Sequence, residues 1–369
     1  MNFEKLNHEA TKLLSGLISI PSFSKEEKDA ADFFAAFLMR VQIPHCRVKN
    51  NIIAYSKGFD TSRPTILLNS HLDTVKPSAG WMYNPFEATS LNGKIYGLGS
   101  NDAGASLCAL TAAFYHYYAH ENLPYNLVLA ATAEEEISGE NGLSAILPQL
   151  GEIDCAIVGE PTQLQLAIAE KGLLVLDCEA EGVSGHAARN EGVNAIDIAV
   201  DDLLRVRNMV FEHESPWLGN VKITPALIQA GTQHNVVPGS CSFTLDVRVT
   251  ECYTHEEIIA MLSQQLRSRI RPRSLRLRSS FISPHHPLVQ AGMGLGSKCY
   301  GSPTLSDKAL MPFPALKCGP GDSARSHTAN EYIGVDEFHN GIRFYIQLLD
   351  NLFAHATQPN CTAALAKNN

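Results

Sequence analysis

Short apolar runs alternate with amphipathic segments from the N-terminus to Lys171. Runs rich in Val, Ile, Leu and Ala are typical of buried strands, whereas apolar positions three and four residues apart are typical of helices. We expect strands at 52–55, 65–69, 126–131, 155–158 and 164–169, and helices at 26–40, 103–120 and 142–150. This alternation predicts an α/β domain with a mostly parallel sheet and helices on both faces.

The pattern changes after Lys171-Gly172, where strands become more frequent than helices. We expect strands at 173–180, 226–231, 241–249 and 274–280, and helices at 194–210 and 254–268. Four strands with two helices predict a small α+β domain whose helices cover one face of the sheet. A strand at 314–318 and a helix at 336–353 then return to the first domain. We therefore expect a discontinuous domain, 1–171 and 284–369, that carries 172–283 as an insertion.

Composition narrows the classes of function. The 369 residues are 45% hydrophobic and carry a formal net charge of −9, so the chain is globular and has no overall basic character for a nucleic-acid backbone. Its one dense basic stretch, 267–278, alternates Arg with apolar residues as a solvated strand face does. No apolar run approaches the roughly 20 residues that span a bilayer. None of the nine cysteines forms the C-x-x-C pair of a zinc ribbon or redox motif. Residues 1–14 lack the apolar core of a secretory signal, so we expect a cytoplasmic protein with reduced thiols.

Acids and histidines follow three of the predicted strands. The strand at 65–69 runs into Ser70-His71-Leu72-Asp73, the strand at 126–131 into three glutamates at 134–136, and the strand at 155–158 into Gly159-Glu160. The carboxyl ends of parallel strands form one edge of a sheet, where binding sites collect. So many acidic groups at one edge would repel one another unless a cation lay among them.

The types of side chain indicate which cation. Imidazole and carboxylate ligands without a thiolate suit zinc, cobalt or manganese. His71 and Asp73 lie on the same side of an extended segment, so Asp73 is expected to accept the second ring N–H of His71. Taken singly, His71 is explained as a core histidine, Asp102 as a helix N-cap and the glutamates as a solvated loop. Their shared position at one predicted edge favours the metal site.

Eight short motifs occur in a fixed order along nearly the whole chain: His71-Leu72-Asp73-Thr74-Val75, 97–102, 134–136, Gly159-Glu160-Pro161-Thr162, Ser184-Gly185-His186, Asn235-Val236-Val237-Pro238, Asp246-Val247-Arg248 and 326–331. This ordered set resembles the acetylornithine deacetylase and succinyl-diaminopimelate desuccinylase family of dimetal zinc hydrolases, and within it most of all acetylornithine deacetylase. The chain departs from the family pattern at Leu98, where the family has Arg, at Gly104, where it has Lys, and at Asn190, where it often has Pro.

The resemblance implies a centre of two divalent ions, zinc or else cobalt. His71 and Glu160 would bind one ion, Glu136 and His327 the other, and Asp102 would bridge them. The implied fold is that of a zinc exopeptidase.

The resemblance also implies roles for two acids that are not ligands. Asp73 would orient His71, and Glu135 would be the general base for a water that the ions activate. A slip of one residue, with Glu134 as the base and Glu135 as the ligand, stays open. The peptide bond after Asp102 is expected to be cis.

The inserted domain resembles a dimerisation and lid domain, so a homodimer is implied. His186 resembles a histidine that reaches across the dimer to the substrate carbonyl oxygen. Asn235 and Arg248 resemble substrate-binding positions, and a guanidinium suits a grip on an α-carboxylate. Asp322 has two open explanations, as a turn-former or as a contact for a cationic side chain.

The function expected first is hydrolysis of the amide bond of an N-acyl amino acid, with N2-acetylornithine giving ornithine and acetate in arginine biosynthesis. Desuccinylation of N-succinyl amino acids and cleavage of dipeptides or other peptides by an exopeptidase are the alternatives on the same dimetal core. A non-catalytic binding protein on this fold is a third possibility, but it would be expected to lose ligand positions that are all filled here. The expected partners are a small-molecule substrate and a second copy of the chain, without nucleic acid or membrane.

Overall fold

The computed structural model describes residues 2–189 and 191–356. The chain folds into two compact units: one comprises Met1–Ile168, Ile282–Tyr300 and Ser306–Asn369, and the other Ala169–Phe281 and Gly301–Leu305. The short segment Gly301–Leu305 belongs to the second unit, although no break in the sequence pattern marks it.

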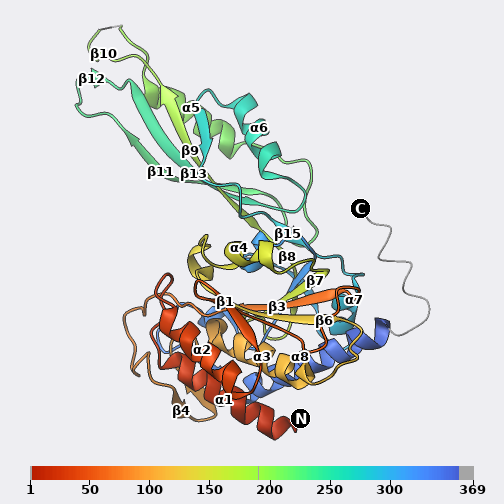
Figure 1. Ribbon diagram of the computed structural model, residues 1–369. Helices are drawn as coiled ribbons and strands as arrows, with labels where there is room; N and C mark the ends of the chain where they lie inside the picture. The colour runs from red at the N-terminus through yellow and green to blue at the C-terminus, as the bar shows by residue number, and fades with distance from the viewer. Residues whose placement is uncertain (1, 190, 357–369) are drawn as a thin grey trace. The chain divides into compact units, whose positions relative to one another are not determined.

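A nine-stranded sheet forms the centre of the first unit (Figure 1). Its four middle strands, β6, β3, β7 and β17, are parallel, and the strands that flank them are antiparallel. The order is β1 (His45–Val48), β2 (Asn51–Tyr55), β6 (Asn126–Thr132), β3 (Thr65–His71), β7 (Cys155–Val158), β17 (Ala315–Lys317), β8 (Leu166–Glu170) and β15 (Ser280–Phe281), with β16 (Cys299–Ser302) also paired to β8. The predicted α/β fold with a mainly parallel central sheet is confirmed.

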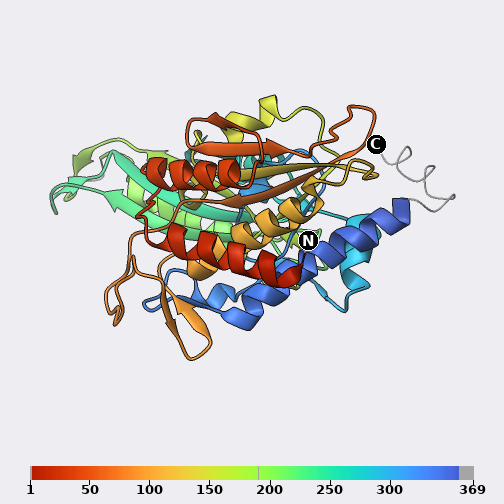
Figure 2. The ribbon, with the colours of Figure 1, turned by 60° about the horizontal axis from the view of Figure 1, so that its bottom comes forward.

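Helices cover both faces of this sheet. On one face α3 packs between α1 and α8 (Figure 2), with α2 beside them and α7 against α8; the opposite face carries α4 and two short 3-10 turns. The bounds are α1 (Phe3–Ile18), α2 (Lys28–Arg40), α3 (Ala105–Tyr118), α4 (Leu143–Ile146), η3 (Leu147–Gln149), η4 (Asp307–Leu310), α7 (Pro287–Met293) and α8 (Val335–Ala356). Because both faces are covered, every residue of β3 and β6 is buried, which explains their continuous apolar runs.

The second unit is built on a four-stranded antiparallel sheet. Its strands are β11 (Lys222–Ala230), β13 (Ser240–Val249), β9 (Gly172–Glu181) and β14 (Arg269–Pro272), in that order. Alternate residues of β9 are buried, and α5 (Ala195–Arg207) and α6 (His255–Gln265) pack on that face. A two-residue pair, β10 (Gly185–His186) with β12 (Val236–Val237), forms a separate ribbon.

The predicted strand at 274–280 is wrong. Helix α6 ends at Gln265, three residues before the predicted end, because the buried Asp202 carboxylate accepts the main-chain N–H groups of Arg267 and Ser268. The strand that follows therefore starts earlier and is β14, which pairs with β9. Pro272 has no N–H to continue the ladder.

A third, small sheet joins two segments that carry predicted ligands. Strands β4 (Thr89–Leu91), β5 (Lys94–Tyr96) and β18 (Tyr332–Gly334) are three residues each, too short for a periodic pattern to predict them. Because β5 precedes the segment 97–102 and β18 follows the segment 326–331, their pairing brings these two motifs side by side.

None of the helices within residues 2–189 and 191–356 is long and apolar enough to cross a membrane. The eight cysteines in the same ranges are free. The ninth, Cys361, lies outside the described residues.

Candidate metal centre

Four neighbouring parallel strands end at the predicted edge. His71 is the last residue of β3, and it lies opposite Thr132, the last residue of β6, which leads into the three glutamates. β7 leads into Glu160, and β17 leads into the loop that reaches His327. The sheet register therefore delivers these side chains to one place, as the strand pattern predicts.

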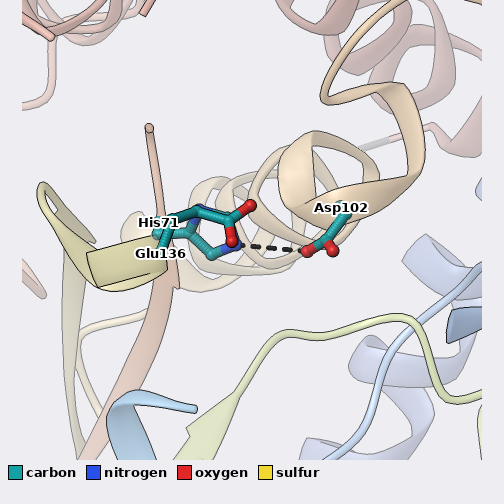
Figure 3. A group of neighbouring side chains, drawn as sticks. All are labelled: His71, Asp102 and Glu136. Atoms are coloured by element: carbon teal, nitrogen blue, oxygen red, sulfur yellow. Dashed lines mark ion pairs between the residues drawn. The ribbon is translucent and has the colours of Figure 1, made fainter. Parts of the chain in front are cut away.

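His71 lies among several acids, two of which, Asp102 and Glu136, are drawn with it in Figure 3. Its Nε2 atom is 3.4 Å from Asp102 Oδ1, 3.7 Å from Glu160 Oε1 and 4.0 Å from Glu135 Oε2. That nitrogen is buried and has no hydrogen-bond partner among the described residues, while Nδ1 lies 2.9 Å from the main-chain oxygen of Asp73. When Nδ1 donates to this oxygen, Nε2 presents its lone pair to the carboxylates, and a cation between them satisfies both sides.

His327 approaches the same acids from the other side. Its Nε2 atom is 3.0 Å from Glu136 Oε2 and 3.6 Å from Asp102 Oδ2. One oxygen of Asp102 therefore faces His71 and the other faces His327, as a carboxylate shared by two ions requires.

Two groups of these side chains have the spacing of metal ligands. One is formed by His71, Asp102 and Glu136, the other by His71, Glu135 and Glu160, and in each group the ligand atoms all lie within 4.8 Å of one another. The donor set of imidazole and carboxylate oxygen fits the divalent ions expected from the sequence.

The crowding of acids raises their affinity for protons. Burial, followed by the neighbouring carboxylates, raises the pKa of Glu136 to about 9 and that of Glu160 to about 8. Burial by itself lowers the pKa of His71, but the acids around it outweigh this effect and raise that pKa well above its usual value. The edge thus favours bound positive charge of any kind, which is the electrostatic condition for a metal site.

The carboxylate and the main-chain oxygen of Asp73 hold different parts of the site. Its carboxylate accepts the main-chain N–H groups of Glu135 (3.0 Å) and Glu136 (3.1 Å) and the hydroxyl of Ser24 (2.7 Å). The carboxylate lies 3.5 Å from His71 Nδ1, farther than the main-chain oxygen of Asp73 itself. The side chain therefore fixes the turn that carries the two glutamates, and the main chain fixes the ring.

The bonds of Glu134 bear on which of the three glutamates face the candidate metal centre. Its carboxylate accepts the main-chain N–H of Asn141 (3.1 Å) and the side-chain amide of Asn141 (2.7 Å), and the residue is buried. Glu134 is thus held within its own turn, whereas Glu135 and Glu136 face the cluster. These bonds favour the expected register, in which Glu135 is the base and Glu136 the ligand, over the alternative with Glu134 as the base.

The predicted residues of the second unit fall into two places. His186 on β10 and Asn235 are close, since the N–H of Ala187 donates to the main-chain oxygen of Asn235 at 3.0 Å. Arg248 lies near the other end of β13, opposite Leu173, and its guanidinium binds both oxygens of Asp246. Eight positions of β13 separate it from Ser240, about 27 Å at the usual rise per residue. One small substrate therefore cannot touch all three residues of a single chain.

Asp322 acts as a turn-former. Its Oδ1 atom accepts the N–H of Ala324 at 2.9 Å, at the start of the 3-10 turn η5 (Ser323–Arg325) that leads to His327. The peptide bond between Asp102 and Ala103 is cis, as the resemblance implies. Sequence reasoning assigned no role to Glu331 or Asn101, which bind main-chain groups of these ligand-bearing segments.

Comparison with known proteins agrees with this arrangement. The model of peptidase family M20/M25/M40 matches residues 67–351. The chain belongs to this family. It is 30% identical to an acetylornithine deacetylase from Edwardsiella ictaluri over 320 residues, which cover 80% of this chain and 81% of the relative. It is 27% identical to a LysW-lysine/LysW-ornithine hydrolase from Sulfurisphaera tokodaii over 356 residues, 92% of this chain and 95% of the relative.

Solved structures share the fold at low identity. Aminopeptidase PepT from Bacillus cereus aligns with a TM-score of 0.73 at 16% identity, covering 94% of this chain and 98% of that one. YxeP from Bacillus subtilis, described as a dinuclear metal-binding peptidase, aligns with a TM-score of 0.71 at 14% identity, covering 95% and 99%. Family membership, these relatives and the clustered ligands identify the protein as a metallohydrolase that acts on amide bonds.

Divalent ions are expected to stabilise the folded chain. A ligand that binds only the folded state at 100 times its Kd adds about 2.7 kcal/mol to the free energy of unfolding, so zinc added to chelated protein should raise Tm. His71→Ala removes the residue common to both ligand groups and should abolish most of this rise. His339→Ala is the matched control, since His339 contacts Thr11 in the helical layer. A rise of wild-type size in His71→Ala would contradict the assignment.

Proposed function

We propose that the enzyme hydrolyses the amide bond of N2-acetylornithine, releasing ornithine and acetate in arginine biosynthesis. The observation that carries the proposal is the position of Asp102 between His71 and His327, with Glu135 and Glu136 beside them. The acetylornithine deacetylase relative supports the choice of substrate. The free thiols of the described residues are consistent with work in the cytoplasm.

The proposed cofactor is a pair of divalent ions, zinc first and cobalt as the alternative. His71 and Glu160 would hold one, Glu136 and His327 the other, and Asp102 both. Such ions polarise an amide carbonyl and lower the pKa of a nucleophilic water.

Glu135 supplies the proton transfers. Its carboxylate is buried, and burial together with the charges of Glu160, Asp307 and Asp73 raises its pKa well above the usual value, against the pull of His71. In the proposed reaction the Glu135 carboxylate takes the proton of the attacking water and returns it to the nitrogen of the leaving amine. The N–H bond from Glu135 to Asp73 fixes the main chain from which it acts.

A second candidate comes from the relative that matches the larger share of the chain. The names of both relatives, the acetylornithine deacetylase and the LysW-lysine/LysW-ornithine hydrolase, contain ornithine. Both candidate substrates therefore have an amide bond to ornithine. The two differ in the group that is removed from the amine.

A substrate panel separates the candidates. We expect kcat/KM for N2-acetylornithine to exceed that for N2-succinylornithine and for dipeptides by at least about tenfold, because a site shaped for a small acyl group discriminates by that order. The panel also includes a LysW-ornithine conjugate, which is the substrate of the second candidate. Highest turnover of a dipeptide would contradict the proposal, and highest turnover of the LysW conjugate would select the second candidate.

Replacement of the general base should remove turnover while leaving ion binding. Glu135→Gln is expected to lower kcat by about 10²–10⁴-fold, the usual contribution of a general base. Glu140→Gln is the matched control in the same loop and should keep kcat, because Glu140 is exposed and belongs to neither ligand group. Stopped assays with both variants at saturating zinc measure this. Near-normal kcat in Glu135→Gln would refute the assigned role.

We also propose that the enzyme is a homodimer formed through the inserted unit. The edge strand β11 exposes Leu227 and Ile228, and the neighbouring helix α5 exposes Val200 and Leu204. An unpaired strand edge with apolar side chains is the kind of surface that a second copy covers. The separation of Arg248 from the pair His186 and Asn235 supports sites that draw residues from both chains.

Mixing two inactive variants tests this arrangement. His186→Ala and Glu136→Ala should each be inactive, but a mixed dimer has one site with an intact metal centre and an intact His186 of the partner. After subunit exchange we expect about one quarter of wild-type activity, since half of the dimers are mixed and each has one complete site. Exchange is followed with two differently tagged chains. Proven exchange without recovered activity would contradict action across the dimer.

A further inference from the structure

Glu331 is a buried acid that belongs to neither group of candidate ligands. Its side chain is 2% exposed and accepts three main-chain N–H groups. Oε1 accepts those of Asn101 (2.8 Å) and Asp102 (2.9 Å), and Oε2 accepts that of Gly99 (3.1 Å). All three donors come from the loop that carries the shared carboxylate, and one belongs to Asp102 itself.

The same loop is tied a second time to the segment of His327. The side-chain amide of Asn101 donates to the main-chain oxygen of Asp322 at 3.1 Å, and its oxygen accepts the N–H of Asp322 at 2.9 Å. The N–H of Gly97 donates to the main-chain oxygen of Glu331, which extends the pairing of β5 with β18. Hydrogen bonds therefore hold together the two segments that bring Asp102 and His327 to the centre.

The paired segments are packed so closely that two glycine positions have no room for a Cβ atom. A Cβ atom at Gly321 would lie 2.4 Å from Asn101 Oδ1, and the residue has a φ of +93°. A Cβ atom at Gly99, φ +74°, would lie 2.7 Å from a methyl carbon of Thr74. Only glycine allows this approach and this conformation at both positions.

We propose that Glu331 is the positioning residue of the metal centre: it fixes the main chain of Asp102 so that the two carboxylate oxygens face His71 and His327, and thereby sets the affinity for both ions. The proposal rests on the two-ion centre of the proposed function. Glu331 acts through the main chain and touches neither ion nor substrate. A carboxylate suits the task because three converging N–H groups need an acceptor without a donor, and charge-assisted bonds hold them more firmly than an amide.

Glu331→Gln tests the proposal with nearly the same shape. The new amide keeps one oxygen for two N–H groups but turns an NH₂ group toward the third donor, so the loop must shift. We expect both stepwise affinities for zinc to fall by about 10–100-fold, the usual effect of changing a residue that orients a ligand. The measurement is a titration of metal-free full-length protein against a chromophoric zinc chelator, which needs no substrate.

Asp202→Asn is the matched control. Asp202 is a fully buried acid that likewise accepts main-chain N–H groups, from Arg267 and Ser268, in the second unit. The control variant loses comparable bonds but should keep both zinc affinities. Loss of affinity in Asp202→Asn equal to that in Glu331→Gln would mean that general destabilisation is the cause and would overturn the proposal.

Glu331→Asp separates the effect of the position of the carboxylate from the effect of its charge. It also provides a second test if Glu331→Gln does not fold. It keeps the negative charge but withdraws the carboxylate by one methylene group, so the same loss of affinity is expected. Wild-type affinities in a folded Glu331 variant, or a loss confined to one of the two binding steps, would overturn the proposal. If the wild-type enzyme binds two zinc ions tightly but does not hydrolyse acetylornithine, the proposed substrate is wrong and the proposed role of Glu331 is unaffected.

Discussion

The repulsion among buried carboxylates at one sheet edge is the constraint on which the arrangement of this enzyme depends. Neighbouring strands lie about 4.8 Å apart, so side chains at the ends of adjacent parallel strands are within reach of one ion. β3, β6 and β7 place His71, Glu135, Glu136 and Glu160 in this way. The spacing that creates the repulsion is therefore also the spacing of metal ligands, so that divalent cations can offset the repulsion.

The chain contributes part of the compensating charge itself. Lys317 is buried at the end of β17 and opposes the effect of burial on the pKa of Glu160, which still rises to about 8. Asp307, buried beneath the centre, accepts the hydroxyl of Thr132 at 2.8 Å and has a pKa raised to about 6, chiefly by burial. Lys317 thus offsets part of the acidic charge at this edge, and Asp307 adds to that charge beside the candidate ligands.

Local patterns predicted the parts of the structure that are determined locally. The strand ends that carry His71 and Glu160 could be found because an apolar run and the polar residue after it are adjacent in sequence. Strand β14 was misplaced because the end of α6 is set by Asp202, more than sixty residues away. The role of Glu331 left no pattern either, because its partners are main-chain amides that any residue provides. The bonds of Glu134 with Asn141, which favour one register of the glutamates, cannot be read from spacing alone either.

Two of the departures from the family pattern can be explained by the packing of the loop that carries Asp102, while the third, Asn190, lies outside the described residues. At Gly104, where the family has Lys, a Cβ atom would lie 2.4 Å from the main-chain oxygen of Gly99, so this loop has no room for a longer side chain. Leu98, where the family has Arg, is 5% exposed and packs into the first unit. Two cations of the family pattern are therefore replaced by close apolar and main-chain contacts. In this chain the loop depends on hydrogen bonds to Glu331 and on the link from Asn101 to Asp322, rather than on charged side chains of its own.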